Sequence, residues 1–248
     1  EYTDTIYVYV RPRLTYKDNI VGAGTDGPAA VTMENGDKLG VSALFYSNPL
    51  ESISDKLVWV IAKDVGENTV LVRDSMGNKG ADADDANLVF NSTSCTYRLD
   101  AKAGIYKVLF YVVGSYSDFD SVQANQPGCA PVSLGVTVNS DFTDKDVTVN
   151  IGGNYSLADA FNIPLSTLKN NFTVTVENNP DNCTSYSSQT MKITALKEGK
   201  ATFTVTKNAH TSVDIPGLTR ESVRVIVTVS ESFSLNVAST TIAVGSSL

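Results

Sequence analysis

The chain has little of the side-chain chemistry on which enzymes and metal centres depend. Its 248 residues include one histidine, His210, one tryptophan and three cysteines. A Ser-His-Asp or Cys-His system would have to use His210, and no serine or cysteine lies in a nucleophile elbow. Zinc needs several His or Cys ligands, and no glycine-rich phosphate loop follows a strand and opens a helix. We therefore expect that the protein is not an enzyme and that His210 is a solvated loop residue.

Positive charge and long apolar runs are also scarce. The chain has 19 Lys and Arg against 27 Asp and Glu, which gives a formal net charge of −8. Phosphate contacts need Lys and Arg, so this balance disfavours nucleic acid and anionic membrane surfaces as partners. No apolar run approaches the roughly 20 residues that cross a membrane. We expect no nucleic acid partner and no membrane insertion of this segment.

The three cysteines, Cys95, Cys129 and Cys183, lie in polar, turn-like surroundings without a CxxC motif. Cys95 and Cys129 fall in the same expected domain, where they could form a disulfide or remain apart. Three scattered cysteines do not define a redox compartment.

Short β-strands dominate the sequence pattern. Runs of alternating or continuous β-branched residues are separated by clusters of Gly, Asn, Asp and Pro. Only 157–161 and 165–168 are expected to form single helical turns. The predicted strands are 5–10, 38–46, 56–62, 69–73, 105–113, 132–138, 147–151, 171–176, 191–195, 201–206, 222–229 and 233–237. Many short strands with frequent turns predict an all-β protein of tandem immunoglobulin-like β-sandwich domains.

A junction pattern occurs three times along the chain. Each time a strongly β-prone strand is followed by a short link and then by a strand that runs into a glycine turn. The pattern predicts that 1–13 is the closing strand of a preceding unit and that 14–138 is an immunoglobulin-like sandwich with long loops. It predicts a second sandwich at 139–231. Residues 232–248 are then the opening strands of a further domain, or a donor strand that completes a neighbouring subunit.

The chain opens on Glu1 rather than on Met and shows no signal peptide. We expect either that a leader has been removed or that the sequence is an excerpt of a longer tandem array.

The segment 191–206 carries a specific motif. Its apolar and small residues are Ile193, Ala195, Leu196, Gly199, Ala201, Phe203 and Val205. This segment resembles the bacterial immunoglobulin-like group 2 domain of the invasin/intimin type. We expect a hairpin with Gly199 in the turn and alternate residues facing the core. The openings 147–157 and 241–248 resemble the start of the same domain, whereas 178–183 and 207–218 depart from a minimal family member.

The first domain shows other immunoglobulin-like features. Trp59 lies in a strand where such folds often bury a Trp, and Tyr106 follows Gly104 as in a tyrosine corner. Val108 stands two residues after that tyrosine in place of Cys. The inter-sheet disulfide of antibody domains is therefore absent, and we expect apolar packing instead.

Two loops are candidate sites. The first holds a cluster of carboxylates that could offer oxygen ligands to calcium, the one cofactor we consider: Asp74, Asp82, Asp84 and Asp85. It lacks the EF-hand order because Met76 stands at the third ligand position. The alternative is a solvated acidic loop.

The second loop, 114–128, carries aromatic and amide side chains suited to a binding surface: Tyr116, Phe119, Asn125 and Gln126. The alternative is a loop folded onto its own domain or onto its neighbour.

These features lead us to expect a non-enzymatic, extracellular structural protein at the cell surface, a segment of an adhesin stalk or a filament subunit. Its expected partners are neighbouring immunoglobulin-like domains or identical subunits arranged head to tail, and possible ligands are a host or surface carbohydrate or protein. One alternative is a phage structural protein of the virion, such as a fibre or capsid decoration. Another is a carbohydrate-binding accessory module, which would need an exposed aromatic platform, whereas we expect Trp59 in the core.

Overall fold

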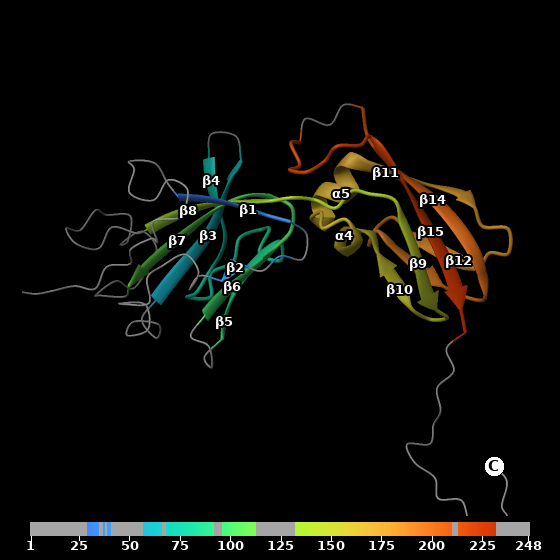
Figure 1. Cartoon of the computed structure of the whole chain (residues 1–248), viewed down its shortest axis with the longest axis horizontal. Helices are drawn as coiled ribbons and strands as arrows, with labels where there is room; N and C mark the ends of the chain where they lie inside the picture. The colour runs from blue at the N-terminus through green and yellow to red at the C-terminus, as the bar shows by residue number, and fades with distance from the viewer. Residues whose placement is uncertain are drawn as a thin grey trace, which may run out of the picture. The chain divides into compact units, whose positions relative to one another are not determined.

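The computed structural model describes residues 29–34, 37, 39–40, 57–65, 68–91, 96–112, 132–209 and 213–231. The chain divides into two compact units (Figure 1). Unit 1 comprises Glu1–Phe142 together with Phe161–Pro164 and Ser212–Thr219. Unit 2 comprises Thr143–Ala160, Leu165–Thr211 and Arg220–Leu248. The segments 1–13 and 232–248, for which we predicted terminal strands, lie outside the described residues.

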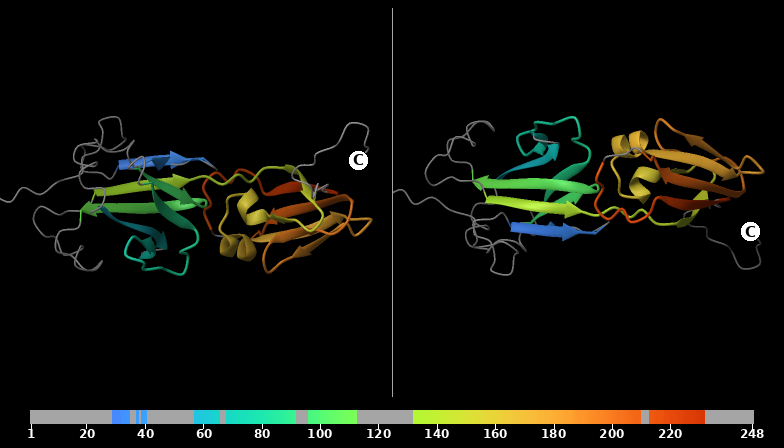
Figure 2. Two further views of the ribbon diagram at one scale, coloured as in Figure 1. Left: turned by 90° about the horizontal axis from the view of Figure 1, so that it is seen from below. Right: turned by 90° about the horizontal axis from the view of Figure 1, so that it is seen from above.

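Unit 1 contains a five-stranded and a three-stranded sheet, whose layers can be followed in Figure 2. The larger sheet has the order β1 (Ala29–Met33), β8 (Val132–Val138), β7 (Gly104–Val112), β3 (Leu57–Val65) and β4 (Asn68–Asp74). The smaller sheet has the order β2 (Leu39–Gly40), β6 (Thr96–Ala101) and β5 (Ala86–Asn91). Strand β1 runs parallel to β8, and the other described pairs are antiparallel.

The predicted core positions of unit 1 are confirmed. Trp59 is 7% exposed and Tyr106 is 3% exposed, and both belong to a cluster that draws on both sheets. The phenol of Tyr106 donates a hydrogen bond to the carbonyl of Lys102 over 2.9 Å. This bond makes the tyrosine corner that the spacing after Gly104 predicts.

Strand β3 is buried on both faces. Trp59 and Ile61 face the main core, while Val58 and Val60 form a second apolar cluster on the other face. This two-sided burial explains why the strand reads as a continuous apolar run rather than an alternating one.

Unit 2 contains a four-stranded and a three-stranded sheet. The larger sheet has the order β11 (Phe172–Asn178), β14 (Gly199–Lys207), β15 (Ser222–Ser230) and β9 (Lys145–Asn150). The smaller has the order β10 (Asn154–Ser156), β13 (Lys192–Ala195) and β12 (Thr184–Ser187). The first strand, β9, again runs parallel to the last, β15.

Two short helices lie between β10 and β11, namely α4 (Leu157–Ala160) and α5 (Leu165–Asn171). The hydroxyl of Ser156 accepts a hydrogen bond from the N–H of Asp159 and caps α4. Asn162 follows with a φ of 54°, a left-handed conformation that Asn tolerates, and so ends that helix. The predicted helical turns are both present, and α5 is longer than expected.

The segment 191–206 is not a hairpin, so that expectation was wrong. Strand β13 pairs with β10 and β12, whereas β14 pairs with β11 and β15 in the other sheet. The turn at Gly199 therefore crosses from one sheet to the other. The apolar alternation arises because each strand faces the same core from its own sheet.

The two units share one topology. Gly104 pairs with Val138 and Gly199 with Val229, so β7 and β14 occupy equivalent positions. Among the described residues, unit 1 has a further strand, β4, at the edge of its larger sheet, and unit 2 has α4 and α5 between its second and third strands. Both units are all-β sandwiches of immunoglobulin-like type, as the strand pattern predicts.

Candidate functional site

The acidic loop between β4 and β5 begins with a buried carboxylate. Asp74 is 3% exposed, and its Oδ1 accepts hydrogen bonds from the N–H groups of Met76 and Asn78, each over 2.9 Å. Its Oδ2 accepts a third bond of 2.7 Å from Nδ2 of Asn78. Gly77 has a φ of 98° and completes the turn. Asp74 therefore closes a turn, a role that the Asp-Ser-Met-Gly-Asn sequence could have indicated.

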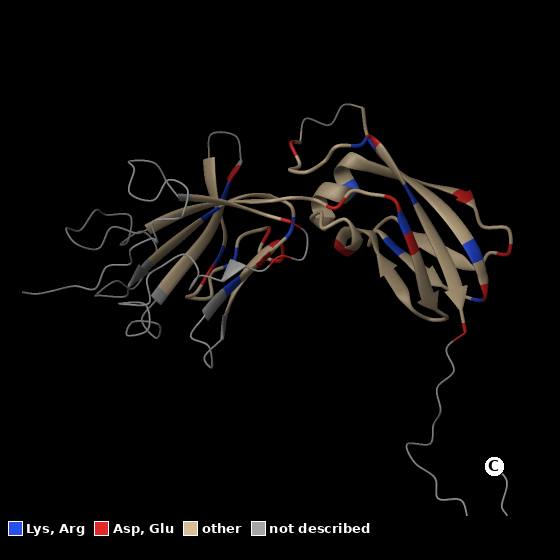
Figure 3. Cartoon of the chain, in the orientation of Figure 1, with Lys and Arg blue, Asp and Glu red and all other residues tan. Residues whose placement is uncertain are grey.

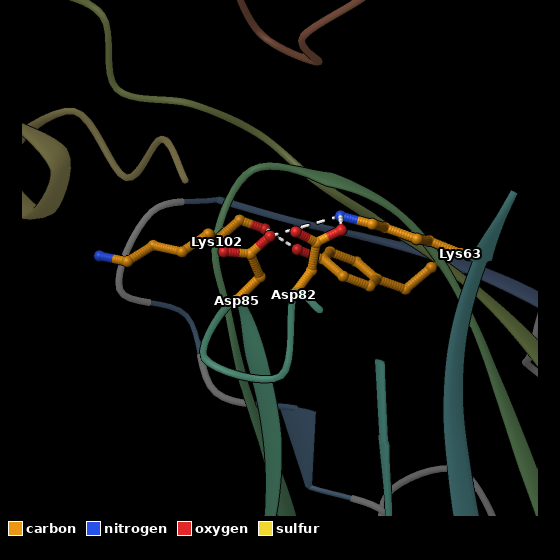
Figure 4. A network of polar contacts seen from close by, with 5 residues as sticks. Lys63, Asp82, Asp85 and Lys102 are labelled. Carbon is orange, nitrogen blue, oxygen red and sulfur yellow. Dashed lines mark hydrogen bonds and ion pairs between the residues drawn. The ribbon is translucent and has the colours of Figure 1, made fainter. Parts of the chain in front are cut away.

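Asp82 and Asp85 lie together around one ammonium group (Figure 4). The Nζ of Lys63, from β3, lies 2.5 Å from Oδ2 of Asp82 and 3.4 Å from Oδ2 of Asp85. The main chain ties this cluster to the tyrosine corner, because the N–H of Lys102 donates to the carbonyl of Asp85 over 2.7 Å. A lysine thus supplies the positive charge between these two carboxylates.

The cluster changes the acidity of its members. Burial raises the pKa of Asp85 above its ordinary value of 3.8, while the charge of Lys63 acts in the opposite direction. Burial also raises the pKa of the Tyr106 phenol well above its usual range, and the charges of Asp85 and Asp82 add to this effect.

Asp84, the fourth calcium candidate, is fully exposed and lies 3.6 Å from Nη2 of Arg73. The four carboxylates thus divide between a turn, a shared lysine and a partly buried arginine. Within the described part of the chain, no group of three or more His, Cys, Asp or Glu side chains is arranged to hold a metal ion. Calcium binding stays an untested prediction for this loop.

A second carboxylate has a structural role in unit 2. Oδ1 of Asp144 accepts a 2.8 Å hydrogen bond from the N–H of Arg224, and its Oδ2 lies 3.1 Å from Nη1 of Arg220. The bond from Arg224, followed by the contacts with Arg220, lowers the pKa of Asp144 below its ordinary value. Acidic and basic residues are interspersed over the described strands of both units (Figure 3).

The end of unit 1 at which β8 leaves the sheet is tightly bonded. The N–H of Asn139 donates to the carbonyl of Met33 over 2.9 Å, and the N–H of Asp141 donates to that of Phe161 over 2.8 Å. Phe142 is 2% exposed, and its ring meets that of Phe161 edge on, with centroids 5.0 Å apart. The sequence predicts a link between two domains at this point. It does not show that the N–H groups of this link are hydrogen-bonded.

The corner of unit 2 around Cys183 also escaped the sequence interpretation. Its thiol is fully buried and lies 3.4 Å from Oδ1 of Asn179, and its carbonyl accepts a bond from the N–H of Leu196 over 2.8 Å. Gly199 was the residue in the sequence that could have pointed to this corner. A larger residue would not fit there, because a Cβ at position 199 would lie 2.8 Å from the Cβ of Cys183.

The remaining predicted site residues lie outside the described residues: Tyr116, Phe119, Asn125, Gln126, His210, Cys95 and Cys129. The binding loop at 114–128 and the cysteine pairing therefore stay predictions. In the described residues, no helix is both long and apolar enough to span a bilayer.

No protein-family model and no curated protein sequence matches the chain. Several solved structures are distantly similar. The second Ig domain of the mouse polymeric immunoglobulin receptor is 14% identical and has a TM-score of 0.26, with 44% of this chain and 93% of that one covered. The Bacteroides ovatus mixed-linkage glucan utilization locus protein SGBP-B is 15% identical and has a TM-score of 0.27, with 80% of this chain and 43% of that one covered.

The human desmocollin-1 ectodomain is 10% identical, with a TM-score of 0.23 and coverage of 82% of this chain and 39% of that one. This chain therefore spans less than half of the length of the two longer neighbours. At such identities and TM-scores these neighbours carry no argument about function, and the fold assignment rests on the strand order described above.

Proposed function

We propose that this chain is a non-enzymatic, extracellular structural protein, a segment of a tandem immunoglobulin-like array that serves as an adhesin stalk or a filament subunit. The observation that carries the proposal is that one strand order occurs twice in succession along the chain. Repetition of a sandwich unit builds length without requiring a new fold for each step.

The segment that follows β8 supports a structural role. The N–H groups of Asn139, Ser140 and Asp141 each donate to a backbone carbonyl, those of Met33, Pro216 and Phe161 in turn. A flexible linker rich in Gly and Ser would leave its main chain to solvent. Here all three N–H groups are bonded within unit 1.

The resemblance to the bacterial immunoglobulin-like group 2 domain supports a bacterial surface location. Five motif positions are buried in unit 2 as the motif implies: Ile193, Ala195, Ala201, Phe203 and Val205. Leu196 departs from the pattern, because it is 50% exposed. Burial of Trp59 also removes the residue that an aromatic carbohydrate platform would have used first.

Immunogold labelling of intact cells of the source organism, with antibodies raised against unit 2, tests this proposal. We expect gold on the outer surface, at the ends or along the length of projecting fibres. Labelling that appears only after permeabilisation would exclude a surface array. Labelling confined to purified virus particles would support the phage alternative instead.

The non-enzymatic part of the proposal is tested through His210, the single histidine. His210→Ala is expected to leave binding, assembly and stability unchanged. Loss of a hydrolytic activity on this substitution would overturn that part of the proposal.

A further inference from the structure

Lys63 reaches two carboxylates that the main chain holds in place (Figure 4). Its Nζ lies 2.5 Å from Oδ2 of Asp82 and 3.4 Å from Oδ2 of Asp85. The N–H of Asp85 donates to the carbonyl of Asp82 over 3.0 Å, and the carbonyl of Asp85 accepts a bond of 2.7 Å from the N–H of Lys102. These bonds fix the spacing of the two carboxylates around the amine.

The cluster is partly withdrawn from water. The side chains of Lys63, Asp82 and Asp85 are 22%, 32% and 12% exposed. Ala83 and Ala86, which follow the two aspartates in the chain, are 8% and 2% exposed. An ion pair in such a place has lost part of the hydration that stabilises its charges. A reaction that removes both charges together is therefore favoured more here than on an open surface.

The amine and the carboxyl carbon of Asp82 are close enough to react. This carbon, Cγ, is one bond from Oδ2, so a rotation of the carboxyl group brings it to about 3–3.5 Å from Nζ, the separation of a near-attack arrangement. Groups held in this way reach effective concentrations of about 10⁵–10⁸ M, which works against the cost of forming an amide in water. The exposed Asp84 instead contacts Arg73, whose guanidinium group is not a nucleophile.

Asp85 is placed to move the protons of such a reaction. The ammonium group of Lys63 must lose a proton before its nitrogen can act as a nucleophile. Oδ2 of Asp85 accepts a hydrogen bond from this group. Burial raises the pKa of the Asp85 carboxyl, so it takes up a proton more readily than an ordinary aspartate. It can therefore serve first as a base and then as an acid.

We propose that Lys63 and Asp82 join in an amide bond, with Asp85 as the group that carries the protons. Asp85 takes one proton from the ammonium group, and Nζ attacks Cγ of Asp82. The N–C bond forms and one C–O bond breaks. Two protons of the ammonium group pass through Asp85 to the departing oxygen, which leaves as water, and the third stays on the amide nitrogen. The two opposite charges disappear together, and the step needs no oxidant, reductant or cofactor.

The bond joins two parts of the sandwich in unit 1. Lys63 belongs to β3 of the larger sheet, and Asp82 lies in the loop that leads into β5 of the smaller sheet. Antibody domains join their sheets by a disulfide, and Val108 stands where one of its cysteines would be. An amide supplies a covalent link at another place, and thiol reductants do not break it.

Intact-mass spectrometry of the purified full chain tests this inference without any substitution. We expect the chain to be lighter than its sequence by one water. Trypsin should leave residues 57–73 uncut at Lys63 and joined to 80–98, as a branched peptide that fragmentation identifies. A succinimide at another aspartate would also lose one water, but it would leave these two peptides separate.

Substitutions identify the reacting groups. Lys63→Arg keeps a positive charge between the carboxylates without a nucleophilic amine, so this variant should have the full mass of its sequence. Asp82→Ser should have its full mass too. Asp84→Asn is the matched control and should still lose one water, because this exposed carboxylate takes no part. Asp85→Asn retains both bonding partners but should form the amide about 10²–10⁴-fold more slowly, so most of the chain should keep its full mass.

A wild-type chain of full mass would overturn the inference and leave an ordinary ion pair. Loss of water that persists in Lys63→Arg would overturn it as well. Complete bond formation in Asp85→Asn, shown to be folded by far-UV circular dichroism, would overturn the role of Asp85. Because surface labelling of cells does not depend on the amide, a labelled protein without this bond would leave the proposed function standing.

Discussion

Units 1 and 2 build the same corner with different chemistry. In unit 1 the chain passes from β6 to β7, and the Tyr106 phenol bonds back to the carbonyl of Lys102. In unit 2 the chain passes from β13 to β14, and the position equivalent to Tyr106 is Ala201. There no tyrosine hydroxyl is available, and Gly199 instead packs closely against Cys183.

This difference shows which features of the fold are general and which are local. The shared strands have the same order in both units, because they follow from alternating apolar residues that face one core. The corner needs only that its polar groups be bonded, and either a side chain or the main chain can satisfy them. Substitutions at equivalent positions should therefore have unequal effects.

The largest effects are expected in the two cores. Trp59→Ala should lower the free energy of unfolding of unit 1 by about 3–5 kcal/mol, and Phe203→Ala should do the same for unit 2, because each leaves a cavity under buried strands. Trp59 is the only tryptophan, so its fluorescence reports unit 1. Phe203→Ala should shift the circular dichroism transition of unit 2 more than the tryptophan transition. Equal shifts of both signals would show that the units unfold together.

The next largest effect on stability should distinguish Gly199 from Gly104, which occupy equivalent positions in the two units. Gly199 has a φ of 148°, and a Cβ there would lie 2.8 Å from the Cβ of Cys183. Gly104 has no such positive φ, and a Cβ there would lie 3.2 Å from the ring of Tyr106. Gly199→Ala should cost about 1–3 kcal/mol because it combines backbone strain with a clash. Gly104→Ala should cost less. Urea unfolding of both variants decides this, and a larger effect at Gly104 would contradict the comparison.

A smaller effect is expected from the tyrosine corner itself. Tyr106→Phe keeps the ring in the core and removes only its hydrogen bond to Lys102, so unit 1 should lose about 0.5–1.5 kcal/mol. The measurement is urea unfolding followed by Trp59 fluorescence. Because Ala201 occupies the equivalent position, unit 2 already shows that the sandwich forms without this bond. No change in stability on Tyr106→Phe would mean that solvent replaces it.

The smallest effect is a pH dependence of opposite sign in the two units. Burial raises the pKa of Asp85 above 3.8, so folded unit 1 binds its proton more tightly than the unfolded chain does. Its contribution to stability is greatest at low pH and falls as the pH rises through the raised pKa. The pKa of Asp144 is lowered, so its contribution to unit 2 is present above 3.8 and is lost as the pH falls through the lowered pKa.

Asp85→Asn and Asp144→Asn should each flatten the pH dependence of one unit. Urea unfolding at pH values on either side of 3.8, followed by Trp59 fluorescence and by circular dichroism, separates the two contributions. If these substitutions changed the pH dependence of the free energy of unfolding in the same direction in both units, the roles assigned to these two carboxylates would be wrong.

Much of the fold was predictable because long strands carry strong patterns. The predicted run 132–138 coincides with β8, and 222–229 differs from β15 by one residue. Strands β10 and β12 were missed because they are short, polar segments at the edges of their sheet. Strand β5 was missed because buried Leu88 is followed by exposed Val89, which removes the alternation between apolar and polar residues.

The candidate site was less predictable. From the sequence, Asp82 and Asp85 are candidate calcium ligands or members of a solvated acidic loop. Their actual partner, Lys63, lies 22 residues before Asp85 and on another strand. Only the packing of β3 beside this loop brings the ammonium group to them.

The parallel pairing of the first and last strands of each unit has a mechanical consequence. Strand β9 opens unit 2 and β15 closes it, and the two run side by side through six paired positions. Tension applied to the two ends of the unit pulls these neighbours in opposite directions along their own axes. The ladder is then loaded in shear, with all of its hydrogen bonds resisting together, rather than peeled open one bond at a time. Such a unit yields to force only when the whole ladder gives way, so its resistance is governed by the rate of unfolding rather than by its equilibrium stability.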